Sequence, residues 1–202
     1  MSLVPAFEIG VWNAWIFMLA WLLFGLAPIV ELILKVKYRD INVKGIFRKM
    51  SASIPRNTTE NKIIYFSVTI IEFFLFIYSV FLPLRLWTAW FYTGLAFFIL
   101  GLIVFEIISV SWATTPINQP ITKGLYRYSR HPIYLASFLQ LIGAGIASAS
   151  WIFLLLVIVH SILTPFVAIV EERFLLEKYG DAYREYMNRT PRWIGIPKSE
   201  AK

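Results

Sequence analysis

The 202-residue sequence contains no cysteine and only two histidines, His131 and His160. Without cysteine there is no disulfide, no thiolate nucleophile and no cysteine-ligated zinc site. Two histidines are too few for a histidine-built metal centre, so we expect no metal. Charged residues are also scarce, at 15% of the chain, whereas a typical soluble domain has about 25%.

Apolar residues take the place of the missing charge. They make up 58% of the chain, and the mean hydropathy is +0.67. This composition excludes a disordered chain, a soluble nucleic-acid-binding protein and an ordinary cytosolic enzyme. It indicates an integral membrane protein, for which we expect an all-α, polytopic fold without a nucleic-acid partner.

Long apolar blocks alternate with basic connections along the chain. Five blocks approach the ~20 residues that a spanning helix needs. No basic segment precedes the first block, which is too long for a cleavable signal, so we expect none. The last two blocks are joined only by residues 148–150, which predicts a tight helical hairpin. The five expected spans are 11–34, 63–82, 87–109, 133–149 and 151–170.

The positions of the basic residues predict the orientation of these spans. The chain has 19 lysines and arginines, and with five spans all of them except Arg85 fall on the same side of the membrane. Because positive charge concentrates in cytoplasmic connections, we expect the N-terminus outside and the C-terminus in the cytoplasm.

The connection before the fourth block reads TKGLYRYSRHPIY over residues 122–134. Pro132 suits the first turn of a helix, where its missing N–H is not needed. Arg130 and His131 then lie at the N-terminus of that helix, a place that favours a carboxylate or another anion. The alternative is a basic anchor that contacts lipid headgroups.

Two adjacent acids, Glu171 and Glu172, follow the fifth block. Acidic residues at the C-terminal end of a helix oppose its dipole, and such an exception often has a functional reason. The hairpin brings this pair to the end of the bundle that holds Tyr134, so a cationic ligand fits between them. Farther on, the spacing of Tyr183 and Tyr186 suits one face of a short helix that folds back over this site.

The run GLYRYSRHPIY, a hairpin and the run EERFLLEKYGDAYREYMNRTPRW resemble the integral-membrane methyltransferases. That family includes the isoprenylcysteine carboxyl methyltransferases and the phospholipid methyltransferases. The resemblance covers about residues 94–195, the expected cofactor-binding core. It implies S-adenosylmethionine at the cytoplasmic side of several membrane helices, under a C-terminal segment. The cofactor-pocket residues that it implies are Tyr126, His131, Pro132, Tyr134, Glu171 and Glu172.

The chemistry of S-adenosylmethionine agrees with that set. Its sulfonium and ammonium suit carboxylates and aromatic faces, and its carboxylate suits Arg130, His131 and a helix N-terminus. Glu171 and Glu172 are the candidates for holding the cation and accepting a proton, and His131 for orienting the cofactor. The stretch 164–170 has no basic residue that could hold a carboxylate. The carboxyl methyltransferases carry an arginine there to hold the substrate carboxylate, so among amines, thiols and carboxylates a carboxylate acceptor is the least favoured.

Three ionisable residues lie within the apolar blocks, where such groups are costly and often functional. Glu72 is midway along the second block and suits either a substrate contact or a paired structural group. Glu106 could face the same site or a solvated helix end. His160 could contact substrate, although a hydrogen-bonded packing role is the better prediction.

The sequence thus predicts a five-span methyltransferase that uses S-adenosylmethionine on a lipophilic acceptor from the membrane. One rival is a reductase of the sterol reductase type, which uses NADPH. Adjacent acids suit a cationic cofactor better than a polyphosphate. The other rival is a small transporter or a membrane scaffold without enzymatic activity.

Overall fold

The computed structural model describes residues 8–23, 25, 58–116 and 119–198, and all that follows refers to them. Every named element of this part is a helix, as the composition predicts. Residues 15–23 are also helical. The named helices are α3 (Thr59–Val80), α4 (Ala89–Thr114), the 3-10 helix η1 (Gly124–Arg127), α5 (Pro132–Ala147), α6 (Trp151–Tyr179) and α7 (Asp181–Arg189).

Three of these helices are long and apolar enough to cross a membrane: Thr59–Val80, Ala89–Trp112 and Trp151–Tyr179. The shorter apolar helix Pro132–Ala147 falls on the expected fourth span. The expected first span, 11–34, is described only at residues 11–23 and 25, and this part becomes helical at residue 15. The helices are consistent with a polytopic membrane protein, while the number of five spans stays a prediction.

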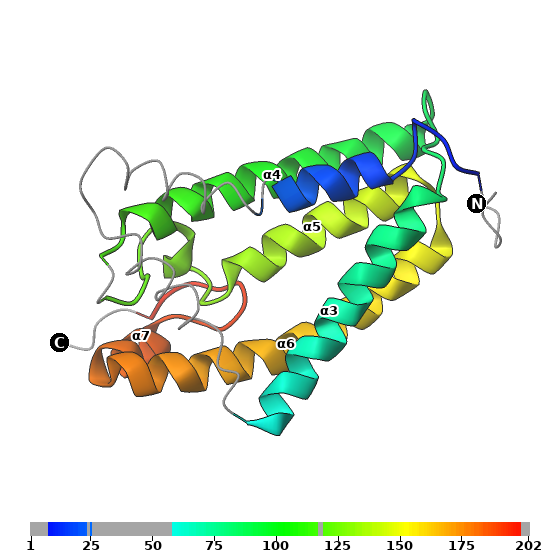
Figure 1. The fold of residues 1–202 in the computed structure, drawn as a ribbon. Helices are drawn as coiled ribbons and strands as arrows, with labels where there is room; N and C mark the ends of the chain where they lie inside the picture. Colours follow the sequence, from blue (N-terminus) through cyan, green and yellow to red (C-terminus); the bar gives the residue numbers. More distant parts are fainter. Residues whose placement is uncertain (1–7, 24, 26–57, 117–118, 199–202) are drawn as a thin grey trace, which may run out of the picture.

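The bundle consists of two helix pairs that diverge toward one end (Figure 1). Helix α4 packs along α5, and α3 packs along α6. Two glycines bring the first pair together, because a Cβ atom at Gly143 would lie 2.7 Å from the carbonyl oxygen of Gly94. Small residues of this kind allow the backbones of membrane helices to approach closely.

Helices α5 and α6 form the expected hairpin. Residues 148–150 connect them, with Ala149 in a left-handed conformation (φ 51°). The hydroxyl of Ser150 then caps α6 by accepting a hydrogen bond from the backbone N–H of Phe153 at 3.2 Å. The short link therefore holds the adjoining ends of the two helices together.

Helix α6 runs nine residues beyond the expected end of the fifth span, to Tyr179. Residues 173–179 contain good helix formers, and the helix ends only where Gly180 takes a positive φ of 56°. Glu171 and Glu172 consequently lie inside α6, about two turns before its end. The expectation that they oppose the dipole of a helix terminus was wrong.

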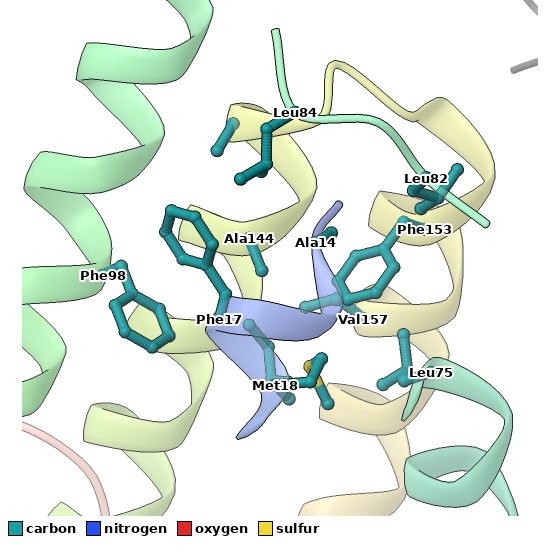
Figure 2. Packing of buried hydrophobic residues seen from close by; sticks show 12 residues of the cluster. Ala14, Phe17, Met18, Leu75, Leu82, Leu84, Phe98, Ala144, Phe153 and Val157 are labelled. Atoms are coloured by element: carbon teal, nitrogen blue, oxygen red, sulfur yellow. The ribbon is translucent and has the colours of Figure 1, made fainter. Parts of the chain in front are cut away.

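A cluster of buried apolar residues joins the two pairs at the end where they converge (Figure 2). The N-terminal segment inserts Phe17 and Met18 between the helices, and the Phe17 ring meets Phe98 edge-on at 4.6 Å between centroids. Leu75 and Phe153 complete the contact between α3 and α6. The connection before α5 and the C-terminal segment lie at the opposite end, beside α7 (Figure 1).

Candidate active site at the divergent end of the bundle

The loop before α5 is shaped by backbone conformation and by local hydrogen bonds. Gly124 begins η1 with φ +62°, and a Cβ atom there would overlap the hydroxyl of Ser111 on α4. The Ser129 hydroxyl accepts a hydrogen bond from the backbone N–H of His131 at 3.1 Å. Pro132 starts α5. These contacts direct the side chains of Arg130 and His131 toward α6.

Glu172 on α6 is the centre of this site, with only 4% of its side chain exposed. Arg192 approaches it in a bidentate manner, with Nε 3.1 Å from Oε1 and Nη2 2.7 Å from Oε2. Arg130 Nε lies 2.9 Å from Oε1, and His131 Nε2 lies 3.1 Å from the same oxygen. A buried carboxylate needs such partners. The contacts with Arg192, Arg130 and His131 supply them, so the charge of Glu172 is already compensated within the protein.

His131 bridges the two acids. Its Nδ1 lies 3.5 Å from Oε2 of Glu171, and its ring is stacked on Tyr134 at 5.6 Å. Burial lowers the pKa of His131, but hydrogen bonds and charges from Glu171 and Glu172 outweigh this, so its pKa is raised above the ordinary value. The site therefore favours the imidazolium form.

Glu171 differs from its neighbour in exposure. Its side chain is 26% exposed, against 4% for Glu172. It also lies close to Tyr126, whose pKa is raised by burial and by the charge of Glu171. Glu171 is thus the acid of the pair that is accessible to a ligand, with Tyr126, Tyr134 and His131 around it.

The C-terminal segment folds back over this site, as the tyrosine spacing predicts. Tyr183 and Tyr186 are buried on one face of α7, and burial raises the pKa of both hydroxyls. The Tyr186 hydroxyl donates a hydrogen bond to the carbonyl of Tyr126 at 2.7 Å. Farther on, the backbone N–H of Gly195 donates to the carbonyl of Tyr128 at 3.0 Å. The segment is consequently fastened to the loop before α5 at several points.

A cavity of about 390 Å³ lies between the two helix pairs. It reaches the site at Tyr134 and extends to Glu72 on α3 and His160 on α6. His160 Nε2 and Glu72 Oε1 are 3.2 Å apart. The hydrogen bond expected for His160 therefore exists, and its partner is the other ionisable group expected within the membrane.

The structure brings most of the predicted site residues together, but not all. Glu106 is half-buried on α4 and does not line the cavity described above. The sequence reasoning assigned no role to Arg192, although it stands in the quoted run as part of PRW. The one sequence feature that could have identified Arg192 is its basic side chain within the segment expected to cover the site. Among the described residues, no group of three histidines or acids is placed to hold a metal ion.

Comparisons with known proteins point to the same family. Residues 84–182 match the family described as phospholipid methyltransferase. A second match is to the protein-S-isoprenylcysteine O-methyltransferase of Schizosaccharomyces pombe. It is 31% identical over 80 residues, which cover 38% of this chain and 32% of that protein. These matches confirm the resemblance to the integral-membrane methyltransferases that the sequence motifs indicate.

A further relative carries a different name. The cobalt-zinc-cadmium resistance protein CzcN of Cupriavidus metallidurans is 32% identical over 75 residues, which cover 37% of this chain and 34% of that protein. The chain spans about a third of the length of these two curated relatives.

Proposed function

We propose that the chain is an S-adenosylmethionine-dependent methyltransferase that acts on a lipophilic acceptor at the cytoplasmic side of a membrane. In this proposal the chain has five spans with the N-terminus outside, and residues 94–195 form the cofactor-binding core. The single observation that carries the proposal is the accessible carboxylate of Glu171 in a ring of aromatic and cationic side chains, on the segment that matches the methyltransferase family.

The residues at the site fit the chemistry of the cofactor. Glu171 would hold its cationic part, because this carboxylate is accessible and stands beside the aromatic Tyr126 and Tyr134. His131 would orient the cofactor through Glu171, because its two ring nitrogens face the two acids and fix the position of the accessible carboxylate. When bound, S-adenosylmethionine supplies the methyl group.

Glu171 and Glu172 have different roles in this proposal. Glu172 is occupied by Arg130, Arg192 and His131, so we assign it a positioning role. It fastens the segment after α7 to α6. That segment shields the site from water, which strengthens the electrostatic interactions inside it.

Binding measurements test the proposal with the full-length protein in lipid nanodiscs. We expect calorimetry to detect binding of both S-adenosylmethionine and S-adenosylhomocysteine. The Glu171→Gln substitution should lower the affinity for S-adenosylmethionine about tenfold or more, as expected for a charged contact. The affinity for S-adenosylhomocysteine should fall less, because this compound lacks the sulfonium. Glu177→Gln, on the exposed surface of α6, is the matched control.

The acceptor requires a second experiment. Methyl transfer from labelled cofactor to a membrane lipid extract, followed by identification of the labelled product, should yield a lipophilic molecule. Stabilisation of the protein by NADPH and not by S-adenosylhomocysteine would overturn the proposal in favour of a reductase. Binding of neither compound would favour a protein without enzymatic activity.

A further inference from the structure

The cavity between the helix pairs has a mainly apolar wall, and its main polar position is a glutamate–histidine pair. Its volume of about 390 Å³ lies within the ~300–1,000 Å³ typical of ligand pockets. Residues from the N-terminal helix and from α3, α4, α5 and α6 line it: Trp21, Leu22, Gly25, Tyr65, Val68, Thr69, Glu72, Phe105, Ile133, Tyr134, Ser137, His160, Thr164 and Val167. A lining of this kind suits a lipophilic molecule with a small polar group.

The polar position is the pair Glu72 and His160. The His160 side chain is only 7% exposed, whereas that of Glu72 is 33% exposed. Because Nε2 of His160 is engaged with Oε1 of Glu72, the imidazole fixes the orientation of the carboxylate. Glu72 lines the cavity, so its carboxylate is available to a polar group of a molecule bound there.

We infer that this cavity is the acceptor site, and that the Glu72 and His160 pair selects an acceptor whose polar group donates a hydrogen bond and is not a carboxylate. A hydroxyl, thiol or amine can donate to Glu72. A carboxylate is repelled, because a like charge in a region of low dielectric is strongly unfavourable. The described cavity lining contains no lysine or arginine to offset that repulsion.

The inference rests on the proposed function, because Tyr134 is the residue shared by the cavity and the cofactor site. It narrows the acceptor by class. A carboxylate is excluded at the polar end that faces Glu72, whereas groups that donate a hydrogen bond, such as hydroxyls, thiols and amines, are retained. Glu72 is the specificity-determining contact, and His160 is a positioning residue.

Photolabelling tests this assignment in nanodiscs of phosphatidylcholine. The probes are a dodecanol that carries an alkyl diazirine and the dodecanoate of the same length. We expect the alcohol to label peptides of α3 and α6, and the carboxylate to label them weakly. Glu72→Gln should lower the ratio of alcohol to carboxylate labelling about tenfold. His160→Gln should also lower this labelling ratio, because the Glu72 carboxylate then loses the contact that fixes its orientation.

The control is Glu106→Gln, a half-buried glutamate of α4 that does not line the cavity. It should leave the labelling ratio unchanged. Binding of S-adenosylhomocysteine to each variant reports that the cofactor site is intact.

Three outcomes would overturn the inference while leaving the proposed function in place. In the first, the labelling ratio is the same in the Glu72→Gln variant and in the wild type. In the second, Glu106→Gln lowers the ratio as much as Glu72→Gln does. In the third, S-adenosylhomocysteine displaces the alcohol probe. The last result would make the cavity part of the cofactor site. A wild-type protein that binds neither S-adenosylmethionine nor S-adenosylhomocysteine would overturn the proposed function and the inference together.

Discussion

Glu172→Gln is the sharpest test of how the C-terminal segment is held over the site. The substitution keeps the size of the side chain but removes the charge that Arg130, His131 and Arg192 share. It also places an amide N–H₂ group where two guanidinium groups donate. Arg130 and Arg192 then lose the carboxylate that they share, whereas His131 keeps its contact with Glu171.

The magnitude follows from burial. Removing one partner of a buried ion pair costs about 3–5 kcal/mol. The side chain of Arg130 is 10% exposed, whereas that of Arg192 is 35% exposed and can be solvated. We therefore expect the lower value, about 3 kcal/mol, which is roughly a hundredfold increase in the local opening equilibrium.

Hydrogen exchange measures that opening at particular amides. The backbone N–H of Arg130 donates to the carbonyl of Pro191, and that of Gly195 donates to the carbonyl of Tyr128. Both should exchange about a hundredfold faster in Glu172→Gln, while amides in the α4 and α5 contact keep their rates. Glu177→Gln should change neither. Equal exchange at Gly195 in the two variants would refute the assignment of Glu172 as the fastening point.

Three further predictions concern neighbouring features. Because contacts raise the pKa of His131, its charged form stabilises the fold fully below about pH 6.5 and less as the pH rises through the folded-state pKa. The gap in melting temperature between the wild type and His131→Gln should therefore narrow with rising pH; a constant gap contradicts this. Gly94→Ala should destabilise the protein, because its Cβ overlaps the backbone of α5, whereas Gly25→Ala, with open space, should be neutral or stabilising by up to about 1 kcal/mol; equal melting temperatures would refute the close crossing. Tyr186→Phe should cost about 1 kcal/mol through the lost hydrogen bond to Tyr126, measured as faster proteolysis of the segment after α7; an unchanged rate contradicts it.

Much of the site was predictable because its residues form local patterns. Pro132 at the start of a helix, a short link at 148–150 and a tyrosine pair three residues apart each specify geometry over a few residues. Once these elements are placed, the hairpin and α7 carry the site residues to one end of the bundle. Apolar block length, in the same way, predicted the helices, while their exact ends depended on residues such as Gly180.

The roles within the acidic pair were not predictable from the sequence. Glu171 and Glu172 are adjacent and chemically alike, and a helix rotates successive side chains by about 100°. Which of them faces Arg130 and Arg192 depends on how α6 is rotated against the loop and the C-terminal segment. That rotation is set by packing along the whole bundle, which no short pattern encodes.

The pairing of Glu72 with His160 has the same origin at longer range. These residues are 88 positions apart, and each one alone suits a structural role. The helix α6 carries both His160 and Glu172, which lie roughly 18 Å apart along its axis at 1.5 Å per residue. An ionisable group within an apolar bundle must find a partner, so each pair restricts how α6 can slide or rotate against its neighbours. The two contacts therefore help to fix the rotation of α6 that places Glu171 beside Tyr126 and His160 on the cavity wall, the two positions to which the proposals above assign the cofactor and the acceptor.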